Sequence, residues 1–172
     1  MKYSNGLTIF ELMIVLAVAS ILLSVGVPSF RGVMMDNRLV SDTNQFVASI
    51  SLARSSAVRF QRDATICVSA NTSATVPTCT ASTDWSQGWM VWVDKNRDAI
   101  TTADEVVSVF APLNDSLSFT AANVNRFTYD SRGFGSTPAD DLTLCDNRSG
   151  ESGRVIKVNA IGRTSVVKQG CS

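Results

Sequence analysis

One carboxylate, Glu11, lies within an otherwise apolar run that extends from Leu7 to Val27. An acidic side chain at the centre of a bilayer costs about 2.5 to 3.5 kcal/mol, so a simple membrane anchor gains nothing from it. The residue therefore indicates a positively charged partner. A cut after Gly6 would place a new amine at Leu7, one helical turn from the equivalent carboxylate of a neighbouring subunit. Such a pair would act as an assembly device.

A second group of polar residues has the spacing of a calcium loop. Oxygen ligands stand at positions one, three, five and twelve of a twelve-residue segment, as Ca²⁺ sites require: Asp94, Asn96, Asp98 and Glu105. Ala99 replaces the glycine of such loops, and the flanking segments have the pattern of strands. A polar hairpin turn is the preferred interpretation, and calcium binding is the alternative. No other metal and no cofactor is predicted.

Four cysteines allow three disulfide pairings. The chain has no C-x-x-C motif and no histidine, which argues against zinc. Position favours two local pairs in an oxidising compartment: Cys67–Cys79 and Cys145–Cys171. Loop-closure entropy would contribute about 3 to 3.5 kcal/mol to each. Free, buried thiols are the alternative.

The composition argues against an enzyme. Without histidine, the chain lacks the commonest general base and metal ligand. It contains no nucleophile elbow, phosphate-binding loop or dinucleotide fingerprint. Acidic residues are plentiful, but nothing singles out a catalytic pair. No enzymatic activity is expected.

Charge is unevenly distributed, although the net charge is zero. Residues 63–147 carry four Lys and Arg against eleven acids, whereas residues 148–172 carry five basic residues against Glu151 alone. The C-terminal tail is therefore a basic patch on a protein with an acidic middle.

Two kinds of element must position these residues. Leu7 to Val27 spans 21 residues, about 31 Å as a helix, which is enough to cross the hydrocarbon core of a membrane. Helical periodicity continues to about Arg62 along one apolar stripe: Phe46, Ile50, Ala53, Ala57 and Phe60. This second part of the helix is expected to pack on a sheet.

From residue 64 onward, the pattern changes to short strands rich in β-branched and aromatic residues. Polar turn clusters separate the strands. The predicted strands are 64–68, 88–93, 105–110, 126–129, 142–145, 154–159 and 163–168. A long helix followed by an antiparallel sheet indicates the α+β class.

The segment Gly6-Leu7-Thr8-Ile9-Phe10-Glu11-Leu12-Met13 resembles the processing site of type IV pilins and pseudopilins. The resemblance implies that prepilin peptidase cleaves between Gly6 and Leu7, and that Leu7 is N-methylated. The family favours Phe at the first mature position, where this chain has Leu7. The alternatives are a simple anchor and a secretory signal cut after Ala17-Val18-Ala19, with a mature start at Ser20.

The soluble half narrows the resemblance. Trp85-x-x-Gly88-Trp89-x-Val91-x-x-Asp94-x-Asn96 resembles a segment of minor pilins of the FimU and FimT kind, which are similar to pseudopilin H of type II secretion. An ordered set of shorter features agrees with this group: Ala53-Arg54, Cys67, Cys145-Asp146, Gly153-Arg154, Gly162-Arg163 and Cys171. Sheet core is the preferred interpretation of the three tryptophans.

The resemblance implies a pilin-like fold with four segments: leader 1–6, transmembrane and assembly helix 7–28, soluble half-helix 29–62 and antiparallel β domain 63–172. It implies a minor pilin that helps to start a type IV pilus and sits near its tip. Other minor and major pilins, prepilin peptidase and an inner-membrane assembly platform are the implied partners. The protein is expected in the inner membrane with a periplasmic domain, and in the extracellular pilus after assembly.

Two alternative functions stay within this family: a type II secretion pseudopilin H, and a competence pilin of the FimT kind that binds DNA. In the FimT branch the tail resembles Gly-Arg-x-Arg, whereas this chain has Gly162-Arg163-Thr164-Ser165 and lacks the second arginine. The candidate DNA contacts are Arg154, Lys157, Arg163 and Lys168. The preferred interpretation is a solvated basic face, or a patch complementary to an acidic neighbouring pilin.

Overall fold

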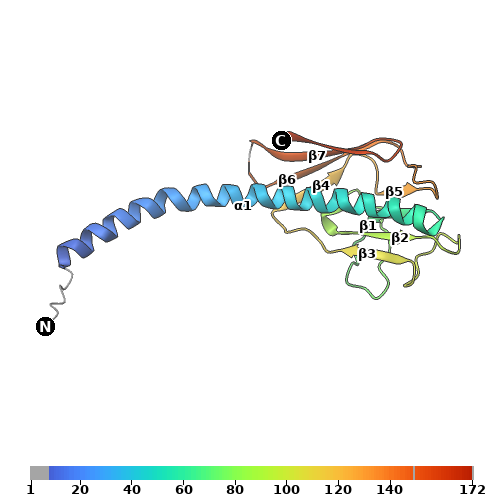
Figure 1. The fold of residues 1–172 in the computed structure, drawn as a ribbon, viewed down its shortest axis with the longest axis horizontal. Coiled ribbons are helices and arrows are strands. Elements are labelled where there is room, and N and C mark those ends of the chain that lie inside the picture. Colours follow the sequence, from blue (N-terminus) through green and yellow to red (C-terminus); the bar gives the residue numbers. More distant parts are fainter. Residues whose placement is uncertain (1–7, 149, 172) are drawn as a thin grey trace. The chain divides into compact units, whose positions relative to one another are not determined.

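The computed structural model describes residues 8–148 and 150–171, without the side chains of residues 25, 27–29, 151 and 152. The chain divides into two units, residues 1–38 and 39–172. One helix, α1 (Ile9–Phe60), supplies most of the described part of the first unit and begins the second (Figure 1).

Among its described residues, the first unit is a helical segment with many exposed apolar side chains, including Ile9, Phe10, Leu16, Leu22 and Phe30. Within the described residues, no helix combines the length and the hydrophobicity that crossing a membrane requires. The predicted span, residues 7–28, includes Leu7 and several side chains that lie outside the described residues.

In the second unit, α1 turns one stripe toward the core. Leu39, Phe46, Ile50, Ala53 and Ala57 are all buried. The stripe from Phe46 to Ala57, with spacings of four, three and four residues, lies on one face of the helix as predicted, and Leu39 extends it. Phe60, at the end of the predicted stripe, is 38% exposed instead. The charged groups of Arg59 and Lys95 lie 5.2 and 5.6 Å from its ring centroid.

The first sheet is antiparallel, with the strand order β3-β2-β1-β5. Its strands are β1 (Ala64–Val68), β2 (Trp89–Val93), β3 (Val106–Phe110) and β5 (Arg126–Tyr129), and the short 3-10 helix η1 (Trp85–Gln87) precedes β2. β1 and β2 are buried along their whole length because both of their faces are covered. One face packs on the main core, and the other on a small cluster of Cys67, Met90 and Trp92 with Cys79.

The second sheet is also antiparallel, with the order β4-β6-β7-β8. Its strands are β4 (Leu117–Ala121), β6 (Asp140–Asp146), β7 (Gly150–Val158) and β8 (Thr164–Cys171). The α+β class with antiparallel strands is confirmed, and the strands divide between two sheets. β4 was not predicted, because Thr120 and Phe119 are its only β-branched and aromatic residues.

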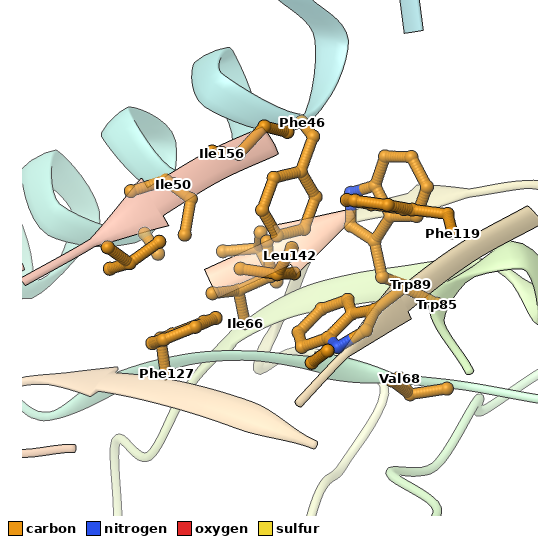
Figure 2. Packing of buried hydrophobic residues seen from close by; sticks show 14 of the residues in the cluster. Phe46, Ile50, Ile66, Val68, Trp85, Trp89, Phe119, Phe127, Leu142 and Ile156 are labelled. Atoms are coloured by element: carbon orange, nitrogen blue, oxygen red, sulfur yellow. The ribbon is translucent and has the colours of Figure 1, made fainter. Parts of the chain in front are cut away.

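The main core lies where α1 meets both sheets, and Phe46 is at its centre (Figure 2). Its ring meets Trp85, Trp89 and Phe119 edge-to-face, with centroid distances of 5.1, 5.4 and 4.9 Å. Such pairs add about 0.5–1.5 kcal/mol each to the burial of the rings. The indole of Trp89 also donates a hydrogen bond to Ser49 Oγ at 3.0 Å. Trp85 and Trp89 are therefore core residues.

Candidate functional site

Glu11 lies in the first turn of α1, whereas Gly6 and Leu7 lie outside the described residues. Thr8 precedes the helix, and its hydroxyl accepts a hydrogen bond from the Glu11 amide at 3.2 Å. This contact satisfies one of the free amides at the start of the helix. The carboxylate is also favourably placed, because a helix N-terminus carries partial positive charge.

The Glu11 side chain is exposed between exposed apolar neighbours, with Phe10 70% and Ile14 49% accessible. Among the residues that the structure describes, no basic side chain forms an ion pair with this carboxylate. The geometry thus leaves Glu11 available to a charge on another molecule.

The four candidate DNA contacts belong to the C-terminal hairpin, which we define as residues 150–171. Arg154 on β7 is directly opposite Lys168 on β8. These two residues share a sheet face with Ile156, which is buried in the main core. Lys157 is one position further along β7 from Ile156 and therefore points to the opposite face.

On that opposite face, Lys157 is paired with Asp141 of β6. The Lys157 ammonium lies 3.1 Å from the Asp141 carboxylate, and both side chains are about half exposed (50% and 52%). An exposed pair of this kind contributes about 0–1 kcal/mol to stability. Arg163 lies in the turn between the strands, and its amide donates to Asn159 Oδ1 at 2.8 Å.

Lys157 and Arg163 line one surface pocket of about 500 Å³, together with Asp141, Asn159 and Ser165. The structure therefore brings two of the four candidate residues together and places Arg154 and Lys168 elsewhere. Asp141 was missed by the sequence analysis. Its only signal was the acidic pair Asp140-Asp141 immediately before the predicted strand 142–145.

The turn of the C-terminal hairpin is fixed by Tyr129 of β5. The Tyr129 hydroxyl donates to the carbonyl of Gly162 at 3.0 Å. A Cβ at position 162 would lie 2.1 Å from the tyrosine ring, and the backbone there has φ of +79°, so glycine is required. Burial raises the pKa of Tyr129 to about 12, although Arg54 lowers it in part. One side chain thus joins the first sheet to the turn that carries Arg163.

The far end of the hairpin is fixed by a disulfide. Cys145 on β6 and Cys171 on β8 are bonded across β7, with their Cα atoms 5.9 Å apart. A Cβ on Gly153 of β7 would lie 2.5 and 3.0 Å from the Cys171 and Cys145 sulfurs. Position 153 must therefore be glycine for the bridge to pass over the strand. The second bridge joins Cys67 to Cys79, so both bridges are the local pairs that position favours.

In the segment 94–105, which has the spacing of a calcium loop, side-chain oxygens accept hydrogen bonds from backbone amides of the same segment. Asp94 accepts hydrogen bonds from the amides of Arg97 and Ala99 at 2.7 and 3.2 Å, and Asp98 accepts one from Ile100 at 2.8 Å. Asn96 Oδ1 accepts one from the Asp98 amide at 3.0 Å. Each contact turns the chain locally.

Glu105, the twelfth residue of the segment, is buried and accepts hydrogen bonds from the Lys95 amide and the Thr102 hydroxyl at 2.9 and 2.7 Å. Burial alone would raise the pKa of Glu105, but these hydrogen bonds lower it below its ordinary value. Over the described part of the chain, no group of three or more acidic, cysteine or histidine side chains is arranged to hold a metal ion. The contacts are those of a polar turn.

Two family models match the chain. The model for type II transport protein GspH matches residues 42–162, and the model for the prokaryotic N-terminal methylation motif matches residues 1–27. The chain belongs to the GspH family. The GspH match covers the second part of α1 and most of both sheets, and it ends before β8 begins.

Solved structures of the type IV minor pilin FimU from Pseudomonas aeruginosa PAO1 resemble this GspH-family chain. One crystal form has 20% sequence identity and a TM-score of 0.57, covering 76% of this chain and 89% of FimU. A second form has 20% identity and a TM-score of 0.55, covering 75% and 92%. The likeness confirms the pilin-like fold. None of the curated proteins matches the chain.

Proposed function

We propose that this protein is a minor pilin that helps to start a type IV pilus and lies near its tip. The observation that carries the proposal is Glu11, exposed in the first turn of an apolar helix without a basic partner among the described residues. A filament supplies the partner, because the amine at Leu7 of a neighbouring subunit is free after cleavage. We assign the protein no enzymatic activity.

The proposed sequence of events begins in the inner membrane, where the apolar run anchors the subunit and the β domain lies in the periplasm. Prepilin peptidase removes residues 1–6, and Leu7 is methylated. The assembly platform then moves the subunit into the pilus beside other minor and major pilins. The two disulfides suit this route, because disulfides persist in the periplasm and outside the cell.

The charge-pairing step can be tested with Glu11→Ala. Removing one partner of a buried ion pair costs about 3–5 kcal/mol, which corresponds to a loss of incorporation on the order of a hundredfold or more. We expect the variant to stay in the membrane fraction but to be missing from sheared pili. Ser20→Ala is the matched control, because its hydroxyl bonds only to Ala17 of the same helix among the described residues.

Deletion of the gene for this protein distinguishes a role in the pilus from the alternative role in type II secretion. We expect fewer surface pili and unchanged secretion of type II substrates. Normal pilus numbers with defective secretion would instead identify the pseudopilin H role, and normal incorporation of Glu11→Ala would contradict the charge-pairing step.

A further inference from the structure

β8 is an exposed edge strand. It ends the order β4-β6-β7-β8, and residues 165–170 are all exposed. Val166 and Val167 point to opposite faces and are 43% and 41% exposed. Proteins commonly protect such an edge with proline, a bulge or a covering loop, because unpaired amides and carbonyls there can join another strand. Val166 and Val167 add apolar surface beside these groups.

The hairpin register shows which backbone groups of β8 face outward. Asn159 and Arg163 form a hydrogen-bonded pair, since the Asn159 amide donates to the Arg163 carbonyl at 3.0 Å. Antiparallel pairs alternate between bonded and non-bonded. Ser165 and Val167 therefore bond to β7, whereas Val166 and Lys168 direct their amides and carbonyls away from it.

β8 is also held in place at both ends. Tyr129 fixes the Gly162 turn that precedes it, and the Cys145–Cys171 disulfide fixes its last residue. An edge that is already ordered loses little conformational entropy when a partner strand binds.

We propose that β8 is a docking strand, and that its partner is an acidic extended segment of another pilin subunit, which adds to the second sheet by backbone hydrogen bonding. Charge identifies the partner. Arg163, Lys168 and the adjacent Arg154 make this edge basic, so carboxylates opposite them are favoured. Antiparallel pairing of β8 with β8 of a second copy would bring two basic edges together, which disfavours self-association. The proposal rests on the pilin function above.

Val166→Pro tests the backbone contact in the full-length protein of the producing strain. Proline removes the outward amide, and edge strands tolerate it where that amide faces solvent. Loss of one hydrogen bond in a partner strand lowers affinity about tenfold or less, and proline also obstructs close approach of that strand. We expect Val166→Pro to lower incorporation into sheared pili by about fivefold or more. Val166→Thr keeps the amide and should incorporate within about twofold of the parent.

Lys168→Glu tests the charge, with Lys168→Arg as its control. We expect Glu to lower incorporation and Arg to preserve it. The melting temperature and disulfide content of detergent-extracted protein must match the parent for each variant, so that a folding defect is recognised. If Val166→Pro lowers the melting temperature, a photo-crosslinker at position 166 replaces it, and an adduct within an acidic segment of a pilin subunit is expected.

Three results would overturn the proposal: parental incorporation of Val166→Pro, an effect of Lys168→Glu without an effect of Val166→Pro, or no adduct at position 166 in pili that contain the protein. The second result would indicate contact through charge alone, as with a nucleic acid. Absence of the parent protein from pili would contradict the pilin function itself, so the two failures are distinguishable.

Discussion

Tyr129 and Gly162 connect the two sheets through one aromatic ring and one carbonyl. The hydroxyl is buried, so it must stay protonated while it donates its hydrogen bond. This contact makes the stability of the folded protein sensitive to alkaline pH.

Tyr129 should weaken the fold as pH rises from 10 to 12. Its pKa is about 12 in the folded protein and about 10 in an unfolded chain, so its contribution is complete below pH 10 and is lost as pH rises through the folded value. At pH 11 the loss is about 1.4 kcal/mol. Denaturant unfolding at about pH 8 and about pH 11 measures this loss.

Tyr129→Phe is the control for that experiment. It loses the hydrogen bond at every pH, about 1 kcal/mol, but lacks the additional alkaline loss. A parent protein that loses no more stability than Tyr129→Phe between the two pH values would contradict the assignment.

Ala99 shows a different residue-scale effect. Its backbone lies in the left-handed region with φ of +57°. The Asp94 carboxylate holds it there by accepting hydrogen bonds from the amides of Arg97 and Ala99. Glycine adopts this conformation without the cost of about 1–2 kcal/mol that other residues have.

Ala99→Gly should therefore stabilise the protein by about 1 kcal/mol. Ala122→Gly is the matched control, since Ala122 is also exposed but does not have a positive φ. That control should lose about 0.4–1 kcal/mol through the greater freedom of the unfolded chain. Thermal unfolding of both variants measures the difference, and equal effects would count against the strain at position 99.

At the scale of elements, strand β7 of the C-terminal hairpin passes beneath the Cys145–Cys171 disulfide, which joins β6 to β8. β7 separates the two bonded strands, and Gly153 leaves the space for the sulfur atoms. The bridge therefore ties three strands together rather than two.

Gly153→Ala should displace the bridge, because the new methyl group would lie 2.5 Å from the Cys171 sulfur. We expect a loss of about 2–5 kcal/mol, as for removal of a native disulfide, together with thiols that react with a labelling reagent. Gly26→Ala is the control, because a Cβ there meets no atom within 4 Å and the position has no positive φ. If Gly153→Ala forms the Cys145–Cys171 disulfide completely and is as stable as the parent, the prediction is wrong. The strands would then make room for the methyl group without a loss of stability.

At the scale of the whole molecule, the basic tail is not one continuous DNA-binding surface. Arg154 and Lys168 share one face of the second sheet, while Lys157 lies on the other and is paired with Asp141. A nucleic acid that contacts one face of the sheet meets only some of the four candidate residues.

We therefore expect weak DNA binding by the full-length protein in detergent. With about two phosphate contacts, the log–log slope of affinity against salt should be about 1.8 or less in magnitude, and Arg163→Ala should reduce it by at most about 0.9. A titration of duplex DNA at several salt concentrations measures the slope. A slope of about 4 or more, lowered by about 0.9 in Arg163→Ala, would favour the competence function instead.

The sequence by itself determined the features that depend on local spacing. The helical stripe from Phe46 to Ala57 follows from a period of 3.6 residues, and most strands follow from runs of β-branched and aromatic residues. The leader motif and the ordered soluble features were enough to identify the pilin-like fold. The order of the cysteines along the chain favoured the two local pairs, which the structure confirms.

Tertiary structure decided which distant segments meet. β4 has few strand-favouring residues and is held by pairing with β6 and by burial of Phe119, neither of which can be read locally. The pairing of β6, β7 and β8 placed Lys157 on the face opposite Lys168, Gly153 beneath the disulfide and β8 at the edge. A sequence records the alternation of faces along one strand, but strand order and register arise from contacts between residues far apart in the chain.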